Sequence, residues 1–296
     1  MLGRDAELAS LVERLRDPAV PLITITGPGG VGKTRLALQA ARDLRDTYDG
    51  DAVFVSLADV TGLQWFVRRI AQAMRLPGLE TGFSESALLD VLADRRLLLV
   101  LDNLEQIPEA SEIIARIVDA APQVKLLVTS RVAMHLRGEV EFPLAPLALP
   151  DASAHRTPTF EELAANSAVA LFVDRARAVD PSFGLTRENA GDIGRICARL
   201  DGLPLAIELS AARLKLLSPA ALLSRLDNRL RILGGGARDL PDRQQNLRQT
   251  IAWSYDLLDA PERSAFRALA VFAGGFTFEA AAALLGVEAE IGRAHV

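Results

Sequence analysis

The sequence predicts an α/β fold in the first half of the chain and a helical region in the second half. Up to about residue 150, short apolar runs alternate with longer segments of helical spacing, and most of these runs are apolar throughout. Continuously apolar runs are typical of parallel strands that are covered on both faces of a sheet. After a proline-rich stretch near residues 145–160 the strand pattern ends. We therefore expect a parallel sheet with helices on both faces, followed by an all-helical domain.

Composition excludes several classes of protein. The chain has 296 residues, of which 50% are hydrophobic and 24% charged, and its formal net charge is −5. These values favour a globular protein of two or three domains and argue against a nucleic-acid-binding surface over the whole chain. The single cysteine, Cys197, excludes an internal disulfide and fits a reducing compartment. No apolar run reaches the length of a membrane span, so we expect a cytoplasmic protein without membrane contact.

The expected elements follow from local periodicity and from glycine and proline punctuation. Ser84 is a plausible N-cap, and Trp65 and Phe66 are expected to pack in the core. The expected strands are 22–26, 52–57, 97–103, 125–131 and 140–144. The expected helices are one within 1–16 after a short entry segment, then 35–48, 61–75, 84–95, 109–121, 166–179, 188–200, 203–217, one from 219, 248–258, 261–272 and 278–285.

One stretch carries the most specific chemical signal. The first strand runs into the sequence GPGGVGKT, and a helix follows it. This is the pattern G-x-x-x-x-G-K-[ST] in the strand–loop–helix setting of a phosphate-binding loop. Glycines let backbone N–H groups turn toward a phosphate, and the helix N-terminus adds unpaired donors. The alternative is a glycine-rich turn without a ligand. We expect a nucleoside triphosphate site formed by Gly27, Pro28, Gly29, Gly30, Val31, Gly32, Lys33, Thr34 and Arg35.

Individual side chains around this loop have distinct expected roles. Lys33 would reach the β- and γ-phosphates, and the Thr34 hydroxyl would ligate Mg²⁺. Asp102 ends an apolar strand, where P-loop enzymes hold the same metal with an acid. The alternative for Asp102 is a residue that merely caps the following turn. The expected metal ligands are Thr34 and Asp102.

The groups available for hydrolysis are less sharply defined. Asn103 follows Asp102, and an amide cannot accept a proton, so the nearest candidate base is Glu105. The alternative for Glu105 is a solvated loop acid. Arg131 follows another apolar strand and could contact the γ-phosphate, or it could be a surface cation. The expected catalytic residues are Lys33, Asp102, Glu105 and Arg131, and we expect hydrolysis to be slow.

Several motifs in this order resemble one family. GPGGVGKT, LLLVLDN, LLVTSR and a later GLPLAI are similar to the NB-ARC type of STAND signal-transduction ATPase, in particular the bacterial group attached to transcriptional regulators. Leu2-Gly3-Arg4 resembles the entry motif of that family, which implies that Arg4 lies near the adenine. Asp201–Leu205 resembles its helical-domain motif, which implies that Pro204 packs on the base. Without the other motifs, Pro204 would simply start a helix.

The resemblance also implies a domain plan. The P-loop strand would lie between the strands ending at Arg131 and Leu144. The segment Leu247–Phe278, with its WSY and VFAGGF sequences, resembles the start of a winged-helix domain. A late histidine motif of that domain is missing, and His295 is a poor substitute because 290–296 matches a translated sequencing adapter. We expect a P-loop domain at 1–150, a helical domain at 151–228, a partial winged helix at 229–289, and a non-native tail at 290–296 on a truncated reading frame.

The function implied by the resemblance is an ATP/ADP-dependent molecular switch. ADP between the first two domains would hold a closed state, and exchange for ATP would permit self-association. Such a switch needs ATP to favour one conformation by differential binding. An effector or DNA-binding domain and helical repeats are expected in the full-length protein. Two other functions stay open: an ordinary catalytic ATPase, and a DNA-binding module that acts through the winged helix.

Overall fold

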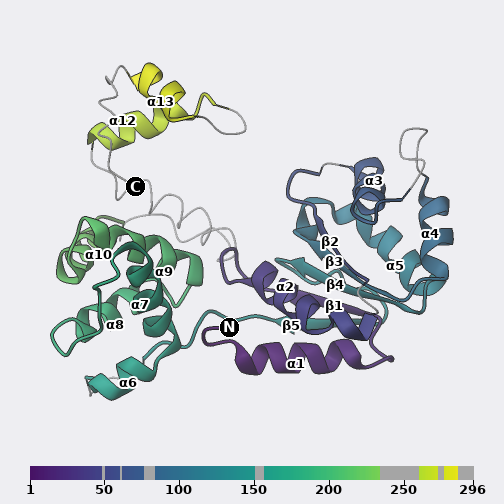
Figure 1. The fold of residues 1–296 in the computed structure, drawn as a ribbon, viewed down its shortest axis with the longest axis horizontal. Coiled ribbons are helices and arrows are strands. Elements are labelled where there is room, and N and C mark those ends of the chain that lie inside the picture. The colour runs from purple at the N-terminus through teal and green to yellow at the C-terminus, as the bar shows by residue number, and fades with distance from the viewer. Residues whose placement is uncertain are drawn as a thin grey trace. The chain divides into compact units, whose positions relative to one another are not determined.

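The computed structural model describes residues 1–48, 51–60, 62–76, 84–150, 157–233, 260–272 and 277–285. The chain divides into two units, Met1–Ala237 and Arg238–Val296, whose elements are labelled in Figure 1. The first unit holds the sheet and most of the helices.

A five-stranded parallel sheet forms the centre of the first unit. Its strands are β1 (Leu22–Thr26), β2 (Ala52–Ser56), β3 (Leu97–Asp102), β4 (Val124–Ser130) and β5 (Glu139–Pro143), in the order β2-β3-β4-β1-β5. The position of β1 between β4 and β5 confirms the expected flanking strands. Thr26 pairs with Ser130, and Ser56 pairs with Asp102. Parallel pairing thus brings the carboxyl ends of the strands, and the loops after them, to one edge of the sheet.

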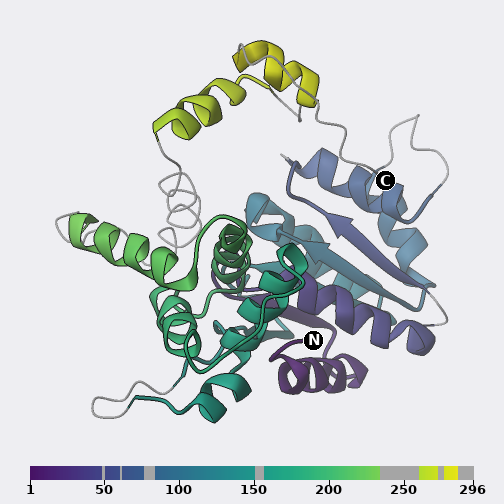
Figure 2. The same ribbon diagram turned by 60° about the vertical axis from the view of Figure 1, so that its left-hand side comes forward.

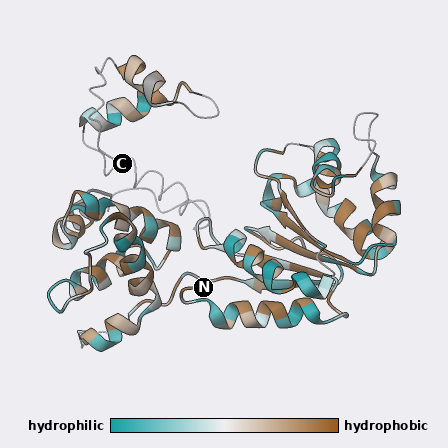
Figure 3. Cartoon of the chain, viewed as in Figure 1, coloured by the Kyte–Doolittle hydropathy of each residue, from teal (hydrophilic) through white to brown (hydrophobic). Residues whose placement is uncertain are grey.

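Helices cover both faces of the sheet (Figures 1 and 2). One face carries α1 (Asp5–Arg16) and α2 (Lys33–Asp43), and the other carries α3 (Leu63–Ala73), α4 (Glu85–Ala93) and α5 (Ser111–Ala120). In Figure 3, which is coloured by hydropathy, the strands are mostly hydrophobic, whereas these helices carry both hydrophobic and hydrophilic residues. Burial of a leucine or isoleucine side chain contributes about 1.5–3 kcal/mol. Coverage on both faces explains why β1, β3 and β4 are buried along their whole length and consist mostly of apolar residues.

Successive residues of β3 pack alternately against the helices on the two faces of the sheet. Leu97, Leu99 and Leu101 belong to one continuous core with α3, α4 and α5. Leu98 and Val100, which lie between them, are also buried but are not part of that core. Successive side chains of a strand point to opposite faces, so this pattern confirms a sheet that is buried on both sides.

Some local expectations are confirmed and others are wrong. Ser84 caps α4, and its hydroxyl accepts the Ala87 N–H. Phe66 is fully buried, but Trp65 is 49% exposed and does not pack in the core. The two side chains are adjacent on a helix, where successive residues are about 100° apart, so only one of them can face the sheet. Two short 3₁₀ turns, η3 (Leu104–Gln106) and η4 (Pro108–Ala110), precede α5, which starts later than expected.

Beyond the sheet domain, the described residues 157–233 of the first unit are mainly helical. It contains α6 (Phe160–Ala165), α7 (Ser167–Val179), α8 (Ala190–Arg199), α9 (Pro204–Ala211), the 3₁₀ turn η5 (Ala212–Lys215) and α10 (Pro219–Leu233). The sequence did not predict α6. Its N-terminus is a capping box, in which Thr159 accepts the Glu162 N–H and the Glu162 carboxylate accepts the Thr159 N–H. The T-x-x-E spacing was therefore a signal for this helix within a stretch interpreted as a linker.

In the second unit, α12 (Ala260–Leu269) and α13 (Phe278–Leu285) are described and contact each other. The WSY sequence, most of VFAGGF, and residues 290–296 lie outside the described residues. The winged helix and the non-native tail therefore stay predictions. Among the helices that the structure describes, none is both long enough and apolar enough to cross a membrane.

Candidate nucleotide-binding site

The P-loop connects β1 to α2 at the carboxyl edge of the sheet. Its backbone is left-handed at Gly30 (φ 78°) and Gly32 (φ 101°), and Gly27 has φ 148°. A Cβ atom at Gly27 would lie 2.6 Å from the carbonyl oxygen of Leu144. Only glycine can bring the chain this close to the segment after β5. The loop is thus folded as a compact turn that ends at the N-cap of α2, with Gly32 as the N-cap residue.

Lys33 begins α2 and folds back over the loop. Its ammonium donates hydrogen bonds to the carbonyl oxygens of Gly27 (2.9 Å) and Pro28 (3.1 Å), and the residue is buried. Burial lowers the pKa of the Lys33 ammonium, and the nearby Arg131 lowers it further, while Glu105 and Asp102 oppose the shift. The lysine therefore lies among the other predicted charged groups of the site.

Two hydroxyls converge on one oxygen of Asp102. The Thr34 O–H and the Thr129 O–H each donate a hydrogen bond of 2.6 Å to Oδ1 of Asp102. The Thr129 oxygen in turn accepts the Asn103 N–H at 3.0 Å. Asp102 and Thr129 are both buried. Three elements that are far apart in the sequence, α2, β3 and β4, are thereby joined through a single carboxylate.

Glu105 and Arg131 form an ion pair beside this cluster. Nε of Arg131 lies 3.2 Å from Oε1 of Glu105, whose side chain is only 16% exposed. Glu105 is thus a largely buried acid rather than a solvated one. Its other oxygen, Oε2, is buried and has no hydrogen-bond partner within the part of the chain that the structure describes. A buried carboxylate oxygen without a donor is costly, which makes Oε2 available to a ligand or a water molecule.

The side chains at this edge of the sheet are suited to Mg²⁺ and to the phosphates of a nucleotide, which a P-loop implies. Thr34 and Asp102 offer a hydroxyl and a carboxylate oxygen, which are the ligand types that Mg²⁺ prefers. No cluster of three or more His, Cys, Asp or Glu side chains that could hold a metal is found in the described ranges. A single carboxylate suffices here, because Mg²⁺ in nucleotide sites is held by one or two carboxylates together with phosphate oxygens and water.

Arg4 lies at the start of α1 and is only 4% exposed. Its guanidinium donates to Oε1 of Glu7 (2.6 Å) and to the carbonyl oxygen of Ala145 (2.5 Å). A Cβ at Gly3 would lie 2.3 Å from Cβ of Ser167, the first residue of α7. The entry motif therefore joins α1, the segment after β5 and the helical region. The contact of Arg4 with an adenine stays a prediction.

The helical region touches the P-loop through α9. Pro204 is the first residue of this helix, and the N–H of Leu205 donates to the carbonyl oxygen of Gly30 at 3.1 Å. A Cβ at Gly30 would lie 2.8 Å from Cβ of Leu205. The Arg35 side chain forms an ion pair with Glu208, with 3.0 Å between Nη1 and Oε1. The base contact of Pro204 stays a prediction, and its helix lies directly against the loop.

Sequence reasoning missed three residues at this edge. Thr129, Leu205 and Glu208 each make a contact with a predicted site residue. For Thr129 there was a signal: a hydroxyl near the end of an apolar strand, at the same sheet edge as Asp102. Leu205 belongs to the stretch 201–205 that resembles the helical-domain motif, but nothing local indicated its partner or that of Glu208, because both partners are more than 170 residues away in the chain.

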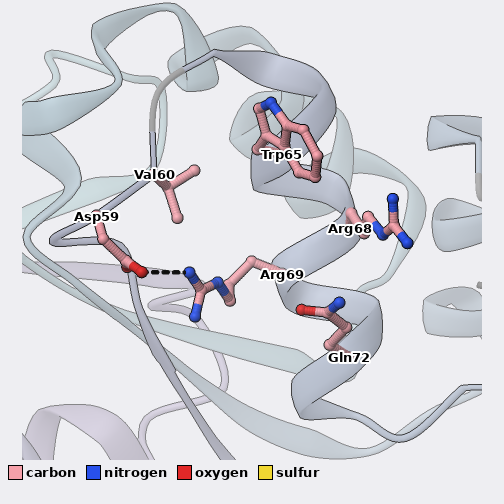
Figure 4. Close-up of a pocket in the computed structure, with 6 residues that line it drawn as sticks. All are labelled: Asp59, Val60, Trp65, Arg68, Arg69 and Gln72. Carbon is pink, nitrogen blue, oxygen red and sulfur yellow. Dashed lines mark hydrogen bonds and ion pairs between the residues drawn. The ribbon is translucent and has the colours of Figure 1, made fainter. Parts of the chain in front are cut away.

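A cavity of about 580 Å³ lies elsewhere, beside α3. Figure 4 shows its lining, in which Arg69 reaches across to Asp59 with a distance of 2.7 Å between Nη2 and Oδ2. Trp65 and Arg68 line it as well, with the guanidinium 5.6 Å from the ring centroid. None of the predicted nucleotide-site residues lines this cavity. We assign it no role in nucleotide binding.

Comparison with known proteins finds one matching domain family and mycobacterial relatives. Residues 4–142 match the NB-ARC domain. An uncharacterized protein of Mycobacterium tuberculosis is 39% identical over 96% of this chain and 68% of its own length. A protein of the same organism, named as an HTH-type transcriptional regulator, is 38% identical over 89% of this chain and 28% of its own length.

Among solved structures, a STAND protein with a tetratricopeptide repeat sensor from Pyrococcus horikoshii aligns over 98% of this chain and 38% of its own. The TM-score is 0.53 and the identity 15%, so this likeness concerns the fold alone. The chain thus spans well under half of that protein and of the mycobacterial regulator. The matched domain, the P-loop geometry and the extended mycobacterial similarity agree: the chain belongs to the NB-ARC family of P-loop ATPases.

Proposed function

We propose that this chain is the nucleotide-dependent switch module of a regulatory protein, which binds Mg-ATP and ADP and hydrolyses ATP slowly. The observation that carries the proposal is the contact of α9 with the P-loop, where Leu205 donates to the Gly30 carbonyl. A ligand in that loop would lie next to the helical region. A nucleotide that binds more tightly to one arrangement of the P-loop and the helical region than to another would favour that arrangement, as a switch requires.

The predicted site residues have separate tasks in this proposal. Lys33 would exchange its two loop carbonyls for phosphate oxygens, and the loop N–H groups would hold the phosphate chain. Thr34 and Asp102 would hold Mg²⁺, which neutralises charge on the phosphates. Arg4 and Pro204 would contribute to the adenine end of the site. Arg131 would stabilise negative charge at the γ-phosphate.

Glu105 is the proposed general base. Its partnerless, buried Oε2 could accept a proton from water, while Oε1 stays paired with Arg131. The pairing would also hold Arg131 in place near Lys33. Self-association in the ATP state and a location in the cytoplasm complete the proposal.

The first experiment measures the nucleotide content of freshly purified protein beside the Lys33→Ala variant, with multiple-turnover hydrolysis on the same samples. Tightly retained ADP in the parent and none in the variant, with turnover over minutes, would support the switch. An empty site with turnover above about one per second, within the usual range of enzymes, would identify an ordinary catalytic ATPase instead.

Self-association needs a separate measurement, because slow turnover alone does not establish a switch. Light scattering after size-exclusion chromatography would compare the protein with ADP, with a non-hydrolysable ATP analogue, and without nucleotide. We expect a larger species with the ATP analogue only. The same mass in all three states would contradict the switch while leaving nucleotide binding intact.

A further inference from the structure

We infer that Thr129 is a positioning residue for magnesium: its hydroxyl sets the orientation of the Asp102 carboxylate and of the turn that follows it. The inference rests on the proposed Mg-nucleotide function and assigns a role to a residue beyond the P-loop and the acidic strand end. Its basis is a chain of hydrogen bonds through one buried hydroxyl.

The first step concerns the carboxylate. Thr129 donates to Oδ1 of Asp102 at 2.6 Å, and Thr34 donates to the same oxygen, so neither hydroxyl occupies Oδ2. When the Thr34 hydroxyl turns to a metal ion, Thr129 is the hydroxyl that still holds Asp102. A carboxylate fixed by such a neighbour does not have to be oriented when the metal binds. Partners of this kind typically change metal affinity by about 10- to 100-fold.

The second step concerns the backbone after β3. Asn103 has φ 63°, a left-handed conformation that non-glycine residues rarely adopt. Its N–H donates to the Thr129 oxygen at 3.0 Å. The turn η3, which carries Glu105, begins directly after Asn103. One hydroxyl thus serves as donor to the metal ligand and as acceptor for the turn that carries the proposed base.

The neighbouring strand offers a matched control. Thr24 on β1 and Thr129 on β4 are both fully buried in the same sheet. The Thr24 hydroxyl has no hydrogen-bond partner within the described chain, whereas the Thr129 hydroxyl has two. Valine replaces threonine with nearly the same shape. Thr24→Val and Thr129→Val therefore remove equally buried hydroxyls that differ in what they bond to.

The test titrates binding of a fluorescent ATP analogue with Mg²⁺, and repeats the binding measurement in EDTA. For Thr129→Val we expect that at least about tenfold more Mg²⁺ is needed to reach half of the full increase in analogue binding. The affinity for the analogue in EDTA should stay within threefold of the parent value. Thr129→Ser should restore the parent value, because it keeps the hydroxyl. Thr24→Val should match the parent. Thermal unfolding without ligand would verify that all variants fold.

The outcomes separate this inference from the proposed function. If the parent binds the analogue with an unchanged affinity in Mg²⁺ and in EDTA, the Mg-nucleotide proposal fails. If the parent depends on Mg²⁺ and Thr129→Val responds as Thr24→Val does, only the role of Thr129 is overturned. A loss of affinity in EDTA as large as that in Mg²⁺ would also overturn it, because the effect would then be on the loop in general.

Discussion

The two sides of the P-loop are built differently. Toward the sheet, the loop ends in buried side chains joined by hydrogen bonds of 2.6 Å, in which Asp102 accepts from Thr34 and Thr129. Toward the helical region, α9 contributes one backbone hydrogen bond of 3.1 Å and an ion pair that is substantially exposed. Buried, charge-assisted hydrogen bonds are roughly twice as strong as neutral ones, whereas exposed ion pairs contribute about 0–1 kcal/mol.

This difference suggests which side can move. The contacts on the sheet side involve buried residues of β3 and β4, so these contacts can break only if the strands unfold. The α9 side can be released by breaking a few contacts at the surface of the loop. A molecule in which a ligand site has one fixed wall and one weakly held wall is suited to convert ligand binding into a change of arrangement.

The largest expected effect is a contrast in hydrogen exchange between the two sides. Amides of β4 should exchange only through global unfolding, because the strand is fully buried between two neighbours. The first-turn amides of α9, including Leu205, should exchange more than about a thousandfold faster. Peptide-resolved mass spectrometry measures both. Equal protection of the two segments would show that the α9 side is not weakly held.

Lys33→Ala tests the sheet side of the loop. We expect at least about a hundredfold loss of affinity for ATP, because the ammonium would bond to charged phosphate oxygens at about 1.5–3 kcal/mol per bond. Equilibrium binding of a fluorescent nucleotide measures it. Lys215→Ala is the control, since that lysine is exposed in η5. Similar affinity in the two variants would remove Lys33 from the site.

Gly202→Ala tests the α9 side. Gly202 has φ 65°, and a Cβ there would lie 2.3 Å from the carbonyl oxygen of Leu147. Its N–H also donates to the carbonyl oxygen of Cys197. Forcing a side chain into this conformation costs about 1–3 kcal/mol, so the helical region should open about tenfold more often.

The single thiol reports this opening. Burial raises the pKa of Cys197 to about 12, so the native thiol is both inaccessible and protonated at pH 8. Labelling with a thiol reagent at pH 8 should be slow in the parent and about tenfold faster in Gly202→Ala. Gly191→Ala is the control, because a Cβ there meets nothing within 4 Å. Fast labelling of the parent would mean that the helical region opens freely without any substitution.

The smallest expected effect belongs to the Arg35–Glu208 pair. These side chains are 60% and 31% exposed, so their coupling should be at most about 1 kcal/mol and should weaken in high salt. A double-mutant cycle with Arg35→Ala and Glu208→Ala, followed by urea unfolding, measures it. A coupling free energy above about 2 kcal/mol that does not decrease in high salt would mean that this ion pair contributes strongly to the contact of α9 with the P-loop.

Local patterns predicted the strands of the sheet well, because a strand that is buried on both faces has a continuous run of mostly apolar residues. The runs that became β1, β3 and β4 could be recognised from their apolar and β-branched residues. The order of the strands could not, because pairing depends on how crossover helices pack; only the two neighbours of β1 were expected, from the family resemblance. Trp65 was misplaced for a related reason, since helical spacing does not say which of two adjacent aromatic residues faces the sheet.

The site was predictable where one motif contains its chemistry. Lys33 and Thr34 follow from the loop sequence, and Asp102 follows from the end of an apolar strand. The pairing of Glu105 with Arg131 joins residues 26 apart, and the contact of Leu205 with Gly30 joins residues far more distant. Such contacts depend on the tertiary fold, so no local pattern could have predicted them.

The buried ammonium of Lys33 has a consequence for proton exchange with the solvent. In the nucleotide-free protein, burial holds the pKa of Lys33 below its ordinary value. Phosphate anions beside it would raise that pKa again. Between the two values the free protein has partly lost the proton that the complex keeps, so binding would take up protons from the buffer at alkaline pH. The observed binding enthalpy would then depend on the ionisation enthalpy of the buffer, and calorimetry in two buffers would count the protons.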